Sequence, residues 1–211
     1  MGGWDEILES WLKALRQSRP VFHSEADFQH ALAWTAHLSD PSLRIRLETK
    51  SAPGTRLDLL ISRSNGSEHL ALELKYLTAA WTGEAEHEPF ALLNQGAQDI
   101  RAYDVVKDIG RVERLVHTQS RWSGAVLVLT NDPSYWSRPG HGRATNAEAF
   151  RIYEHQTLTG QRSWGPNTGA GTMRGRELAI ELHGNYACRW TEYSALPGSR
   201  GRFRMLVFVV H

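Results

Sequence analysis

Asp58, Glu73 and Lys75 are charged residues inside two otherwise apolar runs of residues 54–78. Burying a charge is costly unless it is paired or coordinates a metal ion, so acids in such runs need a compensating partner. Two carboxylates close together suit an oxygen-seeking dication such as Mg²⁺ or Mn²⁺. A lysine two residues beyond one of the acids lies on the same strand face and can orient or help to deprotonate a metal-bound water. The pattern therefore predicts a metal-assisted hydrolytic site.

The turn between the two runs determines how the charged residues face one another. Asn65 and Gly66 are typical of a two-residue type I′ hairpin turn, which requires φ > 0 at both central positions. With that turn, the register places Asp58 opposite Glu73, on one face of the hairpin with Lys75. The opposite face is then apolar, with Leu57, Leu59, Ile61, Leu70, Leu72 and Leu74.

Ordinary ion pairing is the simplest alternative for these charges. Asp58 can pair with Arg56 or Arg63, and Glu73 with Lys75, as surface pairs worth only ~0–1 kcal/mol that need no function. The apolar neighbours of both acids argue against this interpretation.

The segment around these residues resembles the core of the PD-(D/E)XK nuclease superfamily, which has the restriction-endonuclease-like fold. The resemblance rests on Asp58, a short hairpin and then the triplet Glu73-Leu74-Lys75, and it extends over residues 22–131. Leu57 stands where the proline of the superfamily's name would be, a position that its members vary freely.

This resemblance implies a metal-dependent enzyme that cleaves phosphodiester bonds. Asp58 and Glu73 would bind Mg²⁺ or Mn²⁺ together with the carbonyl oxygen of Leu74, and Lys75 would act on the attacking water. Glu25, on an upstream helix, resembles the first acidic motif and would complete the metal site. As an alternative, Glu25 only complements the positive end of its helix, which is worth ~0.3–1 kcal/mol.

Hydrophobic periodicity indicates an α/β protein with a central mixed sheet flanked by helices. The resemblance implies that the core is restriction-endonuclease-like, with extra C-terminal strands. Helices are expected over residues 4–17, from Ser24 as N-cap, and in a long segment that begins at Phe90 and continues through Leu115. Residues 79–89 are expected to be a loop. Strands are expected at 43–50, 125–131, 150–158, 177–182, 188–193 and 203–210.

Several residues outside the central segment are candidate nucleic-acid contacts. Gln95 and Tyr103 lie on the expected long helix, where some relatives of the superfamily place a Gln and a Tyr that touch nucleic acid. The C-terminal half supplies arginines, whose planar fork can grip phosphate: Arg138, Arg143, Arg174 and Arg176. On the same helix, Asp104 with Lys107 and Asp108 with Arg111 are interpreted as i, i+3 surface pairs.

Composition is that of an ordinary globular protein, with 41% apolar and 22% charged residues among 211. We expect a single domain, residues 1–211, with a nuclease-like core at 22–131 and a β-rich, loop-rich extension at 132–211. Cys188 is the only cysteine, which excludes an intrachain disulfide and favours a reducing compartment, so we expect a cytoplasmic protein with no membrane segment.

Charge is distributed unevenly, although the net charge is only +1. The predicted acids fall in the half with acidic excess, and most arginines fall in the other half. The combined interpretation is a divalent-metal-dependent nuclease, with DNA as the expected substrate. If the enzyme cuts both strands, a homodimer is expected. The alternative is a catalytically inactive nucleic-acid- or protein-binding module on the same fold.

Overall fold

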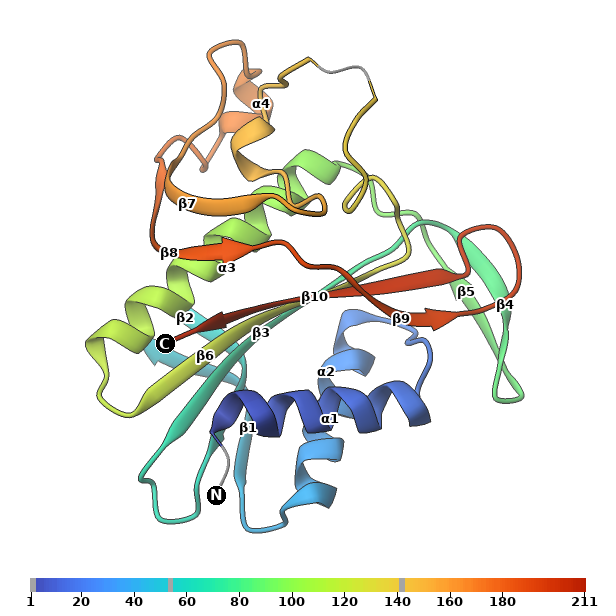
Figure 1. Cartoon of the computed structure of the whole chain (residues 1–211), viewed down its shortest axis with the longest axis vertical. Coiled ribbons are helices and arrows are strands. Elements are labelled where there is room, and N and C mark those ends of the chain that lie inside the picture. The colour runs from blue at the N-terminus through green and yellow to red at the C-terminus, as the bar shows by residue number, and fades with distance from the viewer. Residues whose placement is uncertain (1–2, 53–54, 141–142) are drawn as a thin grey trace.

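A six-stranded mixed sheet forms the centre of the computed structural model (Figure 1). The structure describes residues 3–52, 55–140 and 143–211. The strands follow the order β1 (Arg44–Ala52), β2 (Thr55–Ser62), β3 (His69–Leu77), β6 (Trp122–Thr130), β10 (Arg202–Val210) and β9 (Thr191–Ala195). Only β3 and β6 run parallel, while the other neighbours are antiparallel. The expectation of an α/β protein with a central mixed sheet is confirmed.

Four α-helices and two small hairpins complete the described part of the chain. The helices are α1 (Trp4–Ser18), α2 (Glu25–Ser39), α3 (Gln98–Thr118) and the short α4 (Ala170–Met173), with a 3₁₀ turn, η1, at Glu148–Phe150. The hairpins are β4 (Trp81–Ala85) with β5 (Glu88–Leu92), and β7 (Thr157–Arg162) with β8 (Ile180–Ala187). Within the described ranges, no helix is both long and apolar enough to cross a membrane.

The two faces of the sheet are covered by different elements. One hydrophobic core packs α1 and α2 against the sheet, with Trp11 and Phe28 almost fully buried. The other core packs α3 and the β7–β8 hairpin against the opposite face, around residues such as Ile109 and Phe208. Figure 1 shows this arrangement, with α3 and β7–β8 on the side away from α1. The parallel strand β6 lies between the two cores and is buried from Gly124 to Thr130, as its apolar run predicts.

The start of α2 is fixed by local hydrogen bonds that the sequence predicts. The Ser24 hydroxyl accepts a hydrogen bond from the amide of Asp27 at 3.1 Å, which caps one of the free amides of the first turn. Asp27 accepts from the amide of His23 and pairs with Arg19, so it secures the chain before the helix. This places Glu25 at the first position of α2.

The expected long helix begins later than predicted, and the expected loop at 79–89 is part of a hairpin. Phe90 lies in β5, where its ring is buried, and α3 begins only at Gln98. Ala97 has φ of 57°, a left-handed conformation that an α-helix cannot contain. Apolar residues at helical spacing produced the error, because Phe90 and Leu92 in fact alternate along a strand.

The C-terminal strands also differ from their expected ranges. β10 confirms the strand at 203–210, but β9 and β8 begin three residues later than expected, and β7 overlaps the expected strand at 150–158 only at its end. In the place of that strand, Phe150 ends a 3₁₀ turn and Ile152 packs into the second core. Single buried residues in loops mimic a strand pattern when only the sequence is read.

Candidate functional site

The β2–β3 hairpin has the predicted register but a different turn. Ser62 pairs with His69 and Leu59 with Leu72, as the prediction requires. However, Gly66 alone takes a positive φ, 69°, while Asn65 does not, so the turn is not type I′. The Asn65 side chain instead accepts a hydrogen bond from the amide of Ser67 at 3.0 Å, which makes a longer loop.

Regular pairing between β2 and β3 ends at Leu59 and Leu72. Asp58 therefore does not face Glu73 across a ladder of backbone hydrogen bonds, as the sequence suggested. Its carboxylate turns to the edge of β3 and accepts a hydrogen bond from the amide of Leu74 at 2.7 Å. Leu57 also departs from the predicted apolar face, because it packs in a separate cluster with Ala71 and Leu115.

Beyond Leu72, β3 no longer pairs with β2, and side chains form hydrogen bonds with its free backbone groups. The amide of Tyr76 donates to Glu25 at 2.9 Å, just as the amide of Leu74 donates to Asp58. The side chain of Gln95 donates to the carbonyl of Tyr76 at 3.1 Å. Three side chains that are distant in the sequence, those of Glu25, Asp58 and Gln95, thus bind three backbone groups of one strand. A further contact ties α2 to β2, because Gln29 donates to the carbonyl of Asp58.

A cavity of about 340 Å³ opens beside this edge. Glu25, Asp58, Glu73 and Lys75 all line it, so the structure brings the four predicted catalytic residues together. Gln95 lines it too, from the segment before α3. We call this cavity the acidic pocket.

Helix α3 contributes two further charged residues that the sequence interpretation placed on the surface. Asp108 is only 5% exposed, and its carboxylate lies 2.9 Å from the Lys75 ammonium group and 3.0 Å from the guanidinium group of Arg111. Arg111 also contacts Glu73 at 2.5 Å. The predicted i, i+3 pair of Asp108 and Arg111 is therefore present, but its placement on the surface is wrong.

The spacing of charges on α3 carried a signal for this placement. Arg101, Asp104, Asp108 and Arg111 follow one another at helical spacing and all line the pocket. This charged stripe runs beside the buried stripe of Val105, Ile109 and Val112, so its residues had to lie at the margin of the core. The sequence did not show that the partners of this stripe are Glu73 and Lys75 on β3.

Burial and like charge raise the pKa values of the carboxyl groups in the pocket. Loss of water, with Asp108 and Asp58 nearby, raises the pKa of Glu73 to about 9 in spite of Arg111. Loss of water also raises the pKa of Asp58, and it raises that of the Glu25 carboxyl group, although the residue as a whole is exposed. Burial by itself lowers the pKa of Lys75, but Asp108, Glu25 and Asp58 together raise it above its usual value. Lys75 is therefore a cation in this arrangement.

The donor set in the pocket fits an oxygen-seeking dication in part. Glu73 Oε1 is buried and has no hydrogen-bond partner, and Asp58 uses only Oδ2 in its hydrogen bonds within the described chain. The carbonyl oxygen of Leu74 lies on the same edge and accepts from Lys75 at 3.2 Å. In the described ranges, however, no group of three or more His, Cys, Asp or Glu side chains is arranged to hold a metal ion. Glu25 would therefore join a metal site through water or after a side-chain movement.

The other predicted nucleic-acid contacts are not among the residues that line the acidic pocket, although Arg176 acts on the pKa of Asp104, which does line it. Tyr103 is buried in the second core, where it packs against Phe150 and Trp164. Arg138 lies over the ring of Tyr153, and the remaining arginines, Arg143, Arg174 and Arg176, are not among the residues that line the pocket. The cations that do line it, besides Lys75 and Arg111, are Arg56, Arg101 and Lys107.

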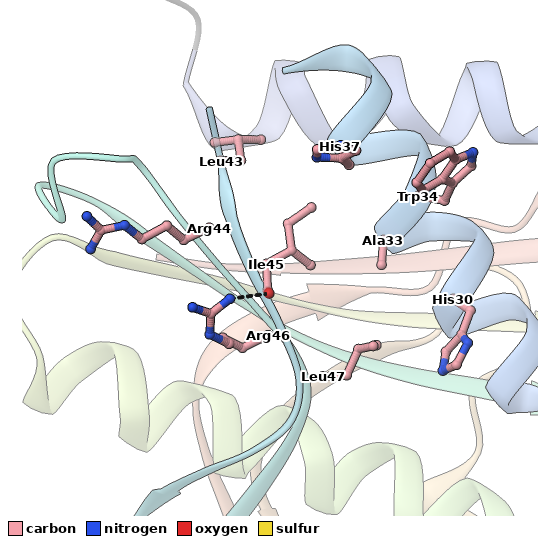
Figure 2. Close-up of a pocket in the computed structure, with 9 residues that line it drawn as sticks. All are labelled: His30, Ala33, Trp34, His37, Leu43, Arg44, Ile45, Arg46 and Leu47. Carbon is pink, nitrogen blue, oxygen red and sulfur yellow. Dashed lines mark hydrogen bonds between the residues drawn. The ribbon is translucent and has the colours of Figure 1, made fainter. Parts of the chain in front are cut away.

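A larger cavity of about 630 Å³ lies between α2 and the edge strand β1 (Figure 2). Trp34 and Leu47 line it and are exposed. Figure 2 shows that Arg44 and Arg46 point away from α2, and Arg46 donates to the carbonyl of Ile45 at 3.0 Å. None of the five acids that line the acidic pocket lines this larger cavity.

Comparisons with known proteins give no relative for this chain. No protein-family model matches it, and no curated protein or solved structure matches it significantly. A functional assignment must therefore rest on the geometry and chemistry of the acidic pocket.

Proposed function

We propose that the chain is a divalent-metal-dependent nuclease that hydrolyses phosphodiester bonds, with DNA as its expected substrate. One observation carries the proposal: Glu25, Asp58, Glu73 and Lys75, from three separate elements, line one pocket at the point where β2 leaves β3. The order of elements supports a restriction-endonuclease-like core, because α2 is followed by β1 and then by the two strands that carry the acids.

Asp58, Glu73 and the Leu74 carbonyl would hold Mg²⁺ or Mn²⁺ at the edge of β3. Such an ion, when bound, supplies a water of lowered pKa and stabilises the charge that develops on the phosphoryl oxygens. The orphaned Oε1 atom of Glu73 and its raised pKa support this assignment, because Arg111 and Lys75 do not offset burial and the neighbouring acids, whereas a dication would favour the ionised carboxylate. Glu25 holds the Tyr76 amide and so fixes this edge of β3 beside the proposed ion.

Lys75 acts in this scheme as a fixed cation. Its contact with Asp108 and its raised pKa keep the ammonium group charged, so it cannot accept a proton from water in this arrangement. It can instead donate hydrogen bonds to the attacking water or to a phosphoryl oxygen. Exposed cations at the rim, Arg56, Arg101 and Lys107, favour an anionic polymer at the mouth of the pocket.

The direct test is cleavage of plasmid, branched, linear and single-stranded substrates by the purified protein with Mg²⁺ or Mn²⁺. We expect activity in the wild type and its loss, by at least about a hundredfold, in Asp58→Ala and Lys75→Ala, because each removes a group that contacts the reacting atoms. Glu68→Ala, in the exposed hairpin loop, is the matched control and should cleave like the wild type. Equal cleavage by the wild type and both site variants would refute the proposed site.

One observation favours the alternative, a binding module without catalysis. Glu73 and Lys75 already have protein partners of opposite charge, Arg111 and Asp108, so ion pairs satisfy part of the charge in the pocket. Calorimetry separates the two functions. If Mg²⁺ and Mn²⁺ show no binding that depends on Asp58, with or without DNA, the alternative is correct.

A further inference from the structure

The guanidinium group of Arg111 contacts two carboxylates through one of its three nitrogen atoms. A single nitrogen, Nη2, contacts Glu73 Oε2 at 2.5 Å and Asp108 Oδ1 at 3.0 Å. The Nε–H group of Arg111 is buried and has no hydrogen-bond partner in the part of the chain that the structure describes. Arginines commonly bind a carboxylate through two parallel N–H groups, but Arg111 binds neither Glu73 nor Asp108 in this way.

An unsatisfied buried N–H group costs typically about 1–3 kcal/mol. Arg151, Arg162 and Arg204 also have such an Nε–H group among the described residues, but only Arg111 of these four lines the acidic pocket. The orphaned donor of Arg111 belongs to a residue that lines the same pocket as the orphaned acceptor of Glu73, so the two unsatisfied groups share one site. A dication and a phosphate group together would satisfy both, the first at the carboxylate and the second at the guanidinium group.

Asp108 sets the spacing of the two cations in the pocket. Its Oδ2 atom contacts Lys75 and its Oδ1 atom contacts Arg111, so one buried carboxylate holds both. Lys75 comes from β3 and Arg111 from α3, on two sides of the pocket. Two cations held by one carboxylate can together bind a single group that has several anionic oxygens.

We propose that Arg111 binds a backbone phosphate of the nucleic-acid substrate and that Asp108 is its positioning residue. This inference rests on the proposed function and deepens it. In the free protein, the guanidinium group of Arg111 lies against the carboxyl group of Glu73. In the complex, its guanidinium group donates to a phosphate oxygen, and Glu73 is released toward the dication.

The first test is binding of fluorescein-labelled single- and double-stranded oligonucleotides, measured by anisotropy at several KCl concentrations without divalent metal. Arg111→Gln should weaken binding by about tenfold to a hundredfold at low salt, the range for loss of one charged hydrogen bond. It should also reduce the slope of log K against log [salt] by about one. Arg111→Lys should retain the slope, because it retains the charge.

The matched control is Arg114→Gln, which removes an exposed arginine three residues further along the same helix and outside the pocket. It should leave both the affinity and the slope unchanged. Thermal melting of each variant checks that it is folded.

The second test compares Mn²⁺ affinity with oligonucleotide affinity in the same variant. A substrate contact and a structural contact predict different outcomes. Calorimetric Mn²⁺ affinity should be unchanged or higher in Arg111→Gln, because a cation beside Glu73 has been removed. Oligonucleotide affinity should fall in the same variant. If both affinities fall together, Arg111 only maintains the pocket, and the proposal is wrong.

Failure of this inference can be distinguished from failure of the proposed function. If the wild type cleaves and Asp58→Ala does not, while Arg111→Gln binds oligonucleotides like Arg114→Gln, only the role of Arg111 is refuted. If the wild type neither binds nor cleaves any nucleic acid, the proposed function fails and the role of Arg111 fails with it.

Discussion

The carboxylate of Asp108 on α3 holds the ammonium group of Lys75 on β3 at 2.9 Å, inside a pocket that contains four further acids. Burial alone would lower the pKa of Lys75, so its charged state depends on the acids around it. This ion pair connects the helix after the acid-bearing strands to the residue at the centre of the proposed site. A variant that lacks the Asp108 charge can therefore test how far this pair sets the pKa of Lys75.

Asp108→Asn should lower the pKa of Lys75, because it removes the nearest negative charge. The chain has only four lysines, so NMR of their ammonium or ε-methylene groups can follow Lys75, with Lys75→Arg as the assignment variant. Asp99→Asn, on the same helix but outside the pocket, is the control. An unchanged Lys75 pKa in Asp108→Asn would show that the pair has little energetic weight.

Glu73 should make the stability of the metal-free protein fall as pH rises. Its pKa is about 9 in the folded state against an ordinary value of 4.5, so the folded state holds a proton that the unfolded state has lost between these values. The free energy of unfolding should therefore decrease from about pH 5 to pH 9. Since one pKa unit corresponds to ~1.4 kcal/mol, the decrease should amount to several kcal/mol.

Glu73→Gln should largely remove this decrease, because the amide does not titrate. Urea unfolding of both proteins at pH 5, 7 and 9 measures the difference, and Glu68→Gln in the exposed loop is the control. Parallel pH profiles of wild type and Glu73→Gln would contradict the raised pKa.

Glu113 should be a major contributor to the docking of β8 on α3. Its carboxylate accepts hydrogen bonds from the amides of His183 and Gly184 and from the hydroxyl of Tyr186 at 2.7 Å, and it is 1% exposed. Glu113→Ala should cost on the order of 3 kcal/mol of unfolding free energy, and Tyr186→Phe about half of that. Urea unfolding measures both, and near-equal stability of all three proteins would refute the assignment.

The contribution of Glu113 should also depend on pH. Burial raises the pKa of Glu113, but hydrogen bonds from Tyr186, Gly184 and His183 outweigh burial and hold the pKa below its usual value. A lowered folded-state pKa means that the stabilisation is present above pH 4.5 and is lost as pH falls through the folded-state value. The stability gap between the wild type and Glu113→Gln should therefore narrow in acid.

Gly124 allows α3 to approach β6 closely. A Cβ atom at this position would clash with Cγ1 of Val112 and would lie 3.3 Å from the carbonyl oxygen of Ala71. Gly124→Ala should therefore destabilise the protein by about 1–3 kcal/mol through overpacking. Adding Val112→Ala should recover part of this loss, because it removes the clashing methyl group. If the double variant loses as much unfolding free energy as the two single variants together, the strain does not come from the contact between Gly124 and Val112.

Local patterns in the sequence predicted the features that depend on neighbouring residues. Alternation along residues 55–77 predicted the faces of β2 and β3, and the position of the Asn65-Gly66 pair predicted their register, although the turn is not type I′. Ser24 predicted the start of α2 through a hydrogen bond to the residue three positions on. The same local rules failed at Phe90, where a strand and a helix share the same apolar spacing.

Tertiary structure alone decided how the acidic pocket is built. The end of the β2–β3 ladder turned Asp58 from a cross-strand partner of Glu73 into an acceptor for the Leu74 amide. The contacts of Asp108 and Arg111 join residues more than 30 positions apart in the chain, and no periodicity specifies such a pairing. Charges that look like surface pairs on an isolated helix became buried partners because packing of α3 on the sheet excluded water from them.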